Sequence, residues 1–188
     1  MSEPVILASS SPRRKQLLEW AEIQFEIMVQ PTSEMFPPGL TPTDAAIYIA
    51  HQKALAVQPQ LESNRIILAA DTIVVLDNEI IGKPTNRNHA IRILTQLQNQ
   101  THRVVTGVAI LKGQQSLLFA DTTAVTFHPL TLSQIEFYVD KYQPYDKAGA
   151  YAIQEWIGVT GIAGIQGDFY NVMGLPVSRV VQELQKFL

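Results

Sequence analysis

One carboxylate in this chain stands where sequence patterns seldom place a charge. Asp71 follows the apolar run 66–70, and a second apolar run, 73–76, begins two residues later. Apolar residues at both alternating sets of positions predict a strand that is buried on both faces. A buried carboxylate loses several kcal/mol of hydration unless a cation, a metal ion or hydrogen bonds replace the water. We therefore expect Asp71 to lie where its strand meets a cleft, beside a counter-charge.

Lys83 is the first candidate for that counter-charge. The turn dipeptide between the apolar runs predicts a hairpin over residues 66–83. Counting back from the turn pairs Lys83 with Thr72, and a bulge would turn the lysine toward Asp71. The alternative is a buried Asp–Lys pair that stabilises the fold and has no part in chemistry.

The N-terminal segment carries a second group of residues suited to chemistry. Ser11 is predicted to cap a helix that has Pro12 at its first position, and Arg13 and Arg14 fall in the first turn. Free backbone amides and the helix dipole favour phosphate there, whereas a pair of arginines opposes the dipole unless an anion is bound. We expect a phosphate site, with a capped helix and solvated arginines as the alternative.

Two further charged residues complete the set. Glu34 lies in a proline-rich loop, 30–40, where a solvated carboxylate is the ordinary interpretation. Lys53 falls in the apolar stripe of a helix that begins after Thr41, so its ammonium either snorkels to the surface or points into a cleft. Such cations and carboxylates together suit a polyphosphate held with a divalent metal ion, where one carboxylate binds metal or takes a proton from water.

Composition restricts the class of protein. The chain has 188 residues, 46% hydrophobic and 16% charged, and is predicted to be globular. A net charge of -3 argues against non-specific nucleic-acid binding. The absence of cysteine excludes thiol catalysis and Cys-based zinc sites, and it fits a cytoplasmic protein. We find no signal-peptide pattern and no apolar run long enough to span a membrane, so we expect no membrane partner.

Strand and helix patterns interleave along the chain, which predicts an α/β fold with a mixed sheet. A second hairpin is expected over 102–111 and 117–127, and a short alternating strand over Tyr151–Gln154. The glycine-rich stretch 158–167 is predicted to be mobile. The phosphate-binding loop GxxxxGK[ST], the dinucleotide motif GxGxxG and the hydrolase motifs GxSxG and HExxH are all absent from the sequence.

Seven stretches, in order over nearly the whole chain, closely resemble the Maf family of nucleoside-triphosphate pyrophosphatases. They are LASSSPRRKQLLE at 7–19, the Glu34 loop, Lys53-Ala54, AADTIVVLDNEIIGKP at 69–84, HRVVTG at 102–107, DKAGAYAIQ at 146–154 and GDFYNVMGLP at 167–176. The resemblance implies a single domain over 1–188, with a twisted mixed sheet, flanking helices and two lobes around a deep cleft, similar to the ITP pyrophosphatases. It also implies hydrolysis of a nucleoside triphosphate to monophosphate and pyrophosphate with a divalent cation, Mg or Mn.

The resemblance also implies roles for particular residues. Asp71 of the ADT motif is the expected catalytic proton acceptor and, with Glu34, a metal ligand. The expected substrate-binding residues are Arg13, Arg14, Lys53, Thr72, Lys83 and Gln154. Within that set, Arg13, Thr72 and Gln154 match the branch of the family that acts on dTTP and UTP.

Four residues depart from the family pattern, and two functions remain open. Asn99 and Gln100 replace a usual Ser-Gly, Glu155 replaces a glycine, and Gln166 stands where glutamate is common. These changes lie mainly in loops. We therefore expect them to affect the reaction rate or the motion of a lid more than the class of reaction. The first function is a dTTP/UTP pyrophosphatase, with clearance of modified nucleotides as an open role. The second is a nucleotide-binding regulator of septum formation without turnover. A nucleoside triphosphate is the expected partner in both, and the sequence leaves a homodimer open.

Overall fold

The computed structural model describes residues 3–61 and 64–187, which form two compact units. The first unit comprises the described residues within Met1–Thr72, Thr106–Asp121 and Gly174–Leu188, and the second comprises Ile73–Val105 and Thr122–Met173. Strands β3, β5 and β6 each contribute residues to both units. The expected single domain over the whole chain stays a prediction.

In the part of the chain that the structure describes, seven strands are hydrogen-bonded in the order β2-β1-β3-β5-β6-β7, with β4 paired to β3. The strands are β1 (Val5–Leu7), β2 (Phe25–Ile27), β3 (Ile67–Leu76), β4 (Glu79–Ile81), β5 (Thr101–Lys112), β6 (Gln115–Phe127) and β7 (Ile162–Gln166). Strand β1 is parallel to β2 and β3, whereas the pairs β3–β4 and β6–β7 are antiparallel. The predicted α/β class with a mixed sheet is therefore confirmed.

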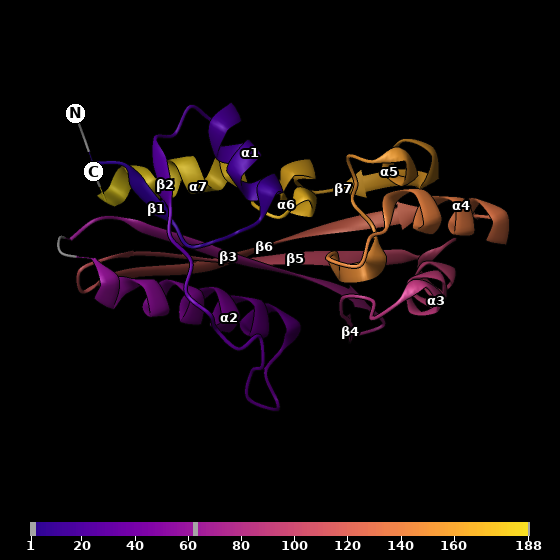
Figure 1. Ribbon diagram of the computed structural model, residues 1–188, viewed down its shortest axis with the longest axis horizontal. Helices are drawn as coiled ribbons and strands as arrows, with labels where there is room; N and C mark the ends of the chain where they lie inside the picture. The colour runs from indigo at the N-terminus through magenta and orange to yellow at the C-terminus, as the bar shows by residue number, and fades with distance from the viewer. Residues whose placement is uncertain (1–2, 62–63, 188) are drawn as a thin grey trace. The chain divides into compact units, whose positions relative to one another are not determined.

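The helices of the first unit cover both faces of its strands. They are α1 (Pro12–Trp20), α2 (Pro42–Val57) and α7 (Val177–Leu184), with the short 3-10 helices η1 (Gln58–Gln60) and η3 (Gln185–Phe187). Figure 1 shows α2 on one face and α1 and α7 on the other. The core under α2 is made of Ile6, Ala8, Ala50, Ala54, Val57, Ile67, Ala69, Ala109 and Leu111. A Cβ at Gly107 of β5 would lie 2.2 Å from the carbonyl carbon of Ala46, so α2 approaches the strand backbone closely.

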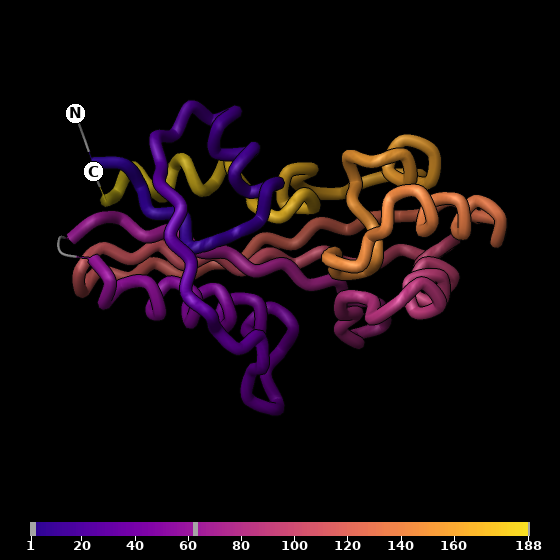
Figure 2. Tube along the Cα trace, in the orientation of Figure 1, coloured from indigo at the N-terminus to yellow at the C-terminus, as the bar shows by residue number. Residues whose placement is uncertain are grey.

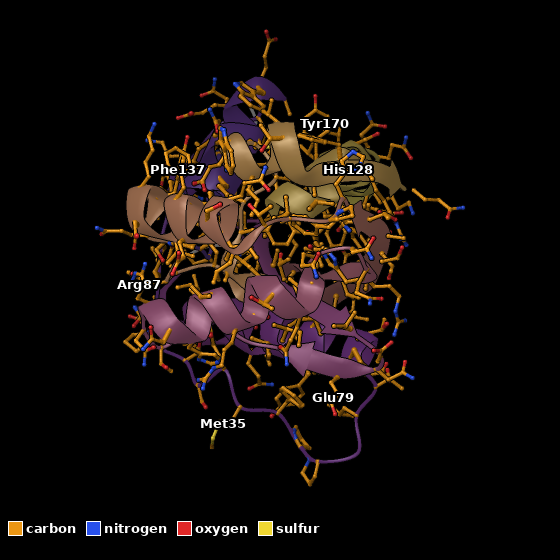
Figure 3. The ribbon with its side chains drawn as sticks, turned by 90° about the vertical axis from the view of Figure 1, so that its right-hand side faces the viewer. Met35, Glu79, Arg87, His128, Phe137 and Tyr170 are labelled. Atoms are coloured by element: carbon orange, nitrogen blue, oxygen red, sulfur yellow. The ribbon has the colours of Figure 1, made fainter. Side chains whose placement is uncertain are left out.

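The helices of the second unit lie between residues 87 and 173. They are α3 (Arg87–Leu97), α4 (Leu132–Tyr142), α5 (Trp156–Gly161) and α6 (Phe169–Met173), with the 3-10 helix η2 (Ala148–Ala150). Figure 3 shows α3 and α4 side by side, with Arg87 labelled on α3 and Phe137 on α4. The Arg87 guanidinium forms a two-pronged bond with Asp140, with Nε 2.6 Å from Oδ1 and Nη2 2.9 Å from Oδ2.

The predicted cap at Ser11 is confirmed, and the helix predicted to begin after Thr41 does begin there. The side chains of Ser11, Thr41, Asn86 and Thr131 each accept a hydrogen bond from a backbone amide in the first turn of the helix that follows. The Thr131 cap is a full capping box, with Gln134 bonding back to the cap residue. Helix starts were predictable because the interactions that fix them lie within three residues.

The predicted strand at Tyr151–Gln154 is wrong. Residues 151–153 are all buried and Gln154 is exposed, so the segment does not alternate between two faces. The Glu155 amide donates to the Ala152 carbonyl at 3.1 Å, which closes a turn. The glycine-rich stretch 158–167 also contains regular structure, namely the end of α5 and all of β7.

The hairpin of β3 and β4 is confirmed as far as β4 extends. Leu76 pairs with Glu79, as the turn dipeptide predicts. The last pairing joins Val74 to Ile81, where β4 ends. The pairing of Thr72 with Lys83 expected by extrapolation is therefore not part of the ladder. Among residues 3–61 and 64–187, none of the helices combines the length and apolarity that crossing a bilayer requires.

A buried histidine forms part of the second unit's core. His102 is 1% exposed, its Nε2 lies 2.7 Å from the Tyr151 hydroxyl, and its ring stacks on Phe127 at 5.6 Å between centroids. Within the described residues its Nδ1 has no hydrogen-bond partner. Burial lowers the pKa of His102 from 6.5 to about 4, because an imidazolium there would lose its hydration.

This depressed pKa predicts acid-sensitive stability. Below pH 6.5 the unfolded chain binds a proton on His102 that the folded protein refuses until about pH 4, so the free energy of unfolding falls across that window. Between pH 7 and pH 5 the loss from this residue amounts to about 2 kcal/mol. We expect His102→Gln to lack that part of the loss in urea unfolding measured at both pH values. The exposed His128 provides the control, since His128→Gln should lose as much stability as the parent. An unchanged loss in His102→Gln would contradict the assignment.

Candidate functional site

In the first unit, one ammonium holds two of the predicted site carboxylates. Lys53 Nζ lies 2.6 Å from Asp71 Oδ1 and 3.1 Å from Glu34 Oε1. Strand β3 supplies Asp71 and helix α2 supplies Lys53, whose side chains are 11% and 18% exposed, whereas Glu34 is 51% exposed. The predicted loop that carries Glu34 extends away from the strands, and Met35 is labelled on it in Figure 3. The counter-charge that β3 requires at Asp71 is therefore Lys53, reached from the apolar stripe of α2.

Arg14, the second arginine of the SPRR motif, is buried, and each of its three guanidinium nitrogens donates a hydrogen bond. Its Nε donates to the Gly174 carbonyl at 2.7 Å, Nη1 to the Ser9 hydroxyl at 3.2 Å and Nη2 to the Thr72 hydroxyl at 3.1 Å. Burial lowers the pKa of Arg14, and the nearby Asp71 charge acts in the opposite direction. The guanidinium still carries its proton, since its ordinary pKa lies far above neutrality. Its expected contact with phosphate stays a prediction.

Thr72, the residue after Asp71, is held as firmly as the carboxylate. Its hydroxyl lies 2.9 Å from that of Thr106 and 3.4 Å from the Gly174 carbonyl, in addition to the bond from Arg14. Asp71 and Thr72 point to opposite faces of β3, so separate contacts fix the two side chains. The strand thus presents both residues of the ADT motif in defined positions.

Lys83 and Gln154 belong to the second unit, and both are exposed. The Gly149 amide donates to the Gly82 carbonyl at 3.3 Å, so the residue before Lys83 is bonded to the loop that leads to Gln154. Figure 2 shows that loop, in orange, beside the magenta end of β4. A Cβ at Gly149, where φ is +70°, would lie 2.9 Å from a methyl carbon of Val74, so this close approach requires glycine.

The structure places six of the predicted site residues in the first unit and two in the second. Those of the first are Arg13, Arg14, Glu34, Lys53, Asp71 and Thr72, and those of the second are Lys83 and Gln154. Sequence reasoning missed Ser9 and Thr106, whose hydroxyls bond to Arg14 and Thr72. Ser9 begins a run of serines and Thr106 lies in the HRVVTG motif. Neither sequence context indicates which distant residue the hydroxyl will bond to. Their roles follow only from tertiary packing.

The residues present suit a magnesium-like ion that also binds substrate. Within the described ranges, no group of three or more His, Cys, Asp or Glu side chains could enclose a metal by itself. Asp71 and Glu34 nevertheless converge on one cation, the Lys53 ammonium. Mg²⁺ is commonly bound by one or two carboxylates, with phosphate oxygens and water completing its shell. This pair of carboxylates fits that pattern.

Comparison with known proteins identifies the relatives of the chain. The family described as Maf-like protein matches residues 4–187. A dTTP/UTP pyrophosphatase of Cytophaga hutchinsonii is 47% identical over 182 residues, which cover 97% of this chain and 83% of that protein. One of Parabacteroides distasonis is 43% identical, covering 97% of this chain and 95% of its own, and one of Bacillus mycoides is 46% identical at the same coverage.

Solved structures give a weaker match. The Ham1 protein of Staphylococcus aureus superposes with a TM-score of 0.46 at 14% identity, over 66% of this chain and 72% of that one. The specific likeness to the ITP pyrophosphatases, including a cleft between lobes, therefore stays a prediction.

The shared ammonium predicts a stability effect. Lys53→Met should lower the free energy of unfolding by about 1–3 kcal/mol, because Asp71 is left as a mostly buried charge without its cation. Adding Asp71→Asn should recover most of that loss, since the uncharged amide needs no counter-ion. Urea unfolding of the single and double variants measures both effects.

Lys15 supplies a matched control. It pairs with Glu19 at 3.6 Å, but both side chains are about half exposed, so Lys15→Met should change stability by less than about 1 kcal/mol. A Lys53→Met protein as stable as the parent, or one that Asp71→Asn fails to rescue, would show that the pair is not the relevant interaction.

Proposed function

The chain belongs to the Maf family, and we propose that it hydrolyses nucleoside triphosphates to nucleoside monophosphate and pyrophosphate, preferring dTTP and UTP. The observation that carries the proposal is the Asp71 carboxylate on a buried strand, 2.6 Å from Lys53 and sharing that lysine with Glu34. The names of relatives at 43–47% identity support the substrate class. A nucleotide-binding regulator would need cations to bind phosphate, but it would not need a carboxylate on a buried strand to activate water.

In the proposed reaction, Asp71 is the proton acceptor. Water attacks the α-phosphorus, the bond to the bridging oxygen breaks, and pyrophosphate leaves; the proton of the water passes to the Asp71 carboxylate. Strand β3 and the Lys53 contact hold that carboxylate in one place, which reduces the reorganisation needed when charge develops.

Positive groups balance the charge of the triphosphate. Arg13 lies in the first turn of α1, where backbone amides and the dipole favour phosphate, and Lys83 is the further cation that we assign to the substrate. Asp71 and Glu34 are the residues that would hold a divalent ion, Mg or Mn, which when bound neutralises charge on the leaving pyrophosphate. A triphosphate carries about four negative charges, so side-chain cations without such an ion leave the leaving group poorly stabilised.

We assign the reading of the base to Gln154, with Arg13 and Thr72 as the other selectivity positions that the family resemblance implies. The Gln154 amide has both a donor and an acceptor, so it can bond to a carbonyl and to N3–H of uracil or thymine together. Cytosine has an acceptor at N3 and a donor amine, so the same amide would have to flip and its fixed neighbours would lose their partners. We place the reaction in the cytoplasm, which the cysteine-free composition fits.

The proposal predicts a defined product. With Mg²⁺ or Mn²⁺ and a panel of nucleoside triphosphates, we expect pyrophosphate as the first product, with dTTP and UTP turned over fastest and activity lost when EDTA removes the metal. Direct detection of pyrophosphate and monophosphate, for example by ³¹P NMR, checks the bond that breaks. Orthophosphate as the first product, or nucleotide binding without turnover, would overturn the proposal.

Asp71→Asn is the matching variant. Loss of a general base should reduce kcat by about 10²–10⁴-fold, while the folded protein melts no lower than the parent because asparagine is less costly to bury than a carboxylate. Parental turnover in Asp71→Asn with metal present would remove Asp71 from the role of base.

Gln154 can be tested separately from the reaction. Gln154→Ala should reduce the kcat/KM ratio of UTP to CTP while leaving the metal requirement unchanged, because the base edge lies apart from the reacting phosphate. A site built on hydrogen bonds rejects a mismatched partner strongly, so the parental ratio should be large. A ratio that survives Gln154→Ala would mean that another group reads the base.

A further inference from the structure

The turn that carries Gln154 is anchored on both sides of the exposed glutamine. The Glu155 amide donates to the Ala152 carbonyl at 3.1 Å, and the Gly158 amide donates to the Glu155 carbonyl at 2.9 Å. A Cβ at Gly158 would lie 1.7 Å from the Ile153 carbonyl oxygen, so the first turn of α5 packs directly on the backbone before Gln154. The Gln154 side chain is exposed, whereas residues 151–153 before it are buried.

One buried hydroxyl joins the two ends of that turn. Tyr138 of α4 is 0% exposed, and its hydroxyl accepts the Ala152 amide at 3.1 Å while donating to a carboxylate oxygen of Glu155. The Tyr138 ring stacks on Tyr142 at 5.0 Å between centroids, which fixes the direction of the hydroxyl. Tyr138 therefore contacts the residue two before Gln154 and the residue directly after it.

Glu155 is held from a second direction. Its other carboxylate oxygen lies 3.7 Å from Lys147 Nζ, and that ammonium also bonds to Asp146 at 2.8 Å. Lys147 is 11% exposed and Glu155 22% exposed, so this ion pair is partly shielded from water. The Trp156 ring that follows packs edge-on against Phe137, one residue before Tyr138 on α4.

We propose that Tyr138 and Glu155 form a clasp that positions Gln154 for reading the nucleobase; this inference rests on the proposed function, in which Gln154 is the base reader. An amide that must present a donor and an acceptor to one base edge has to be held within about 0.5 Å of its working position. The Gln154 side chain is exposed, so its position depends on the backbone of the turn. Tyr138 and Glu155 are positioning residues, and neither is assigned a contact with substrate.

The clasp also gives a reason for glutamate at position 155. A glycine there would leave the Tyr138 hydroxyl with its Ala152 donor but without the acceptor that Glu155 provides. A buried hydroxyl without an acceptor is costly, so the Tyr138 hydroxyl and the Glu155 side chain depend on one another. This departure from the family pattern is thus matched by a partner on α4.

Tyr138→Phe tests the clasp, because it removes the hydroxyl and keeps the ring. We expect the UTP to CTP ratio of kcat/KM to fall by about tenfold, with UTP still hydrolysed and the metal requirement unchanged. Hydrogen exchange at the Ala152 and Glu155 amides should accelerate in the same variant. Tyr142→Phe removes a hydroxyl one turn further along α4 and should leave both the ratio and the exchange as in the parent.

Variants at position 155 provide a rescue. Glu155→Gln retains an acceptor for the Tyr138 hydroxyl and should keep most of the parental ratio, whereas Glu155→Ala should lose it as Tyr138→Phe does. If Tyr138→Phe lowers kcat/KM equally for UTP and CTP, or leaves amide exchange unchanged, the hydroxyl only stabilises the fold and the clasp is overturned.

The two proposals can fail separately. If Gln154→Ala reduces the ratio but Tyr138→Phe leaves it unchanged, base reading stands and the clasp is wrong. If Gln154→Ala itself leaves the ratio unchanged, the assignment of the base reader fails and the clasp loses its positioning role. Absence of pyrophosphate release from the parent protein would instead overturn the proposed function.

Discussion

The first unit is organised by the need to supply a counter-charge to one carboxylate on an apolar strand. Lys53 reaches Asp71 of β3 from α2, and that reach requires the helix to lie close to the strands. The stripe of α2 is built from alanines such as Ala50 and Ala54, and Gly107 admits its backbone against β5. The small residues at this interface therefore allow the Lys53 ammonium to come within reach of the Asp71 carboxylate.

Sequence patterns predicted what short-range interactions determine. Helix caps, the apolar stripe of α2, strand β3 and the turn before β4 all followed from residues a few positions apart. The counter-charge of Asp71 did not, because extrapolating the hairpin favoured Lys83, whereas β4 ends at Ile81 and the lysine in contact is Lys53. Which cation meets the carboxylate is decided by how α2 packs on the sheet, and periodicity contains no such information.

The turn around Gln154 is a case in which tertiary contacts override a local sequence pattern. Alternation over Tyr151–Gln154 predicted a strand, but the Tyr138 hydroxyl and the Glu155 carboxylate stabilise a turn there. Tertiary hydrogen bonds from α4 outweigh a weak local β preference, as is usual for short segments. Ser9, which accepts a hydrogen bond from Arg14, and Thr106, which bonds to Thr72, were missed for the same reason. The role of a buried hydroxyl can be recognised only once its hydrogen-bond partner is known.

Stability and the proposed reaction place opposite demands on Lys53. Its ammonium contacts both Asp71 and Glu34, and these contacts stabilise the fold. In the proposed reaction a triphosphate would compete for the same ammonium, so Lys53 could contact phosphate only by giving up part of its contact with the carboxylates. The ion pair that stabilises the fold would then be the one that substrate binding rearranges.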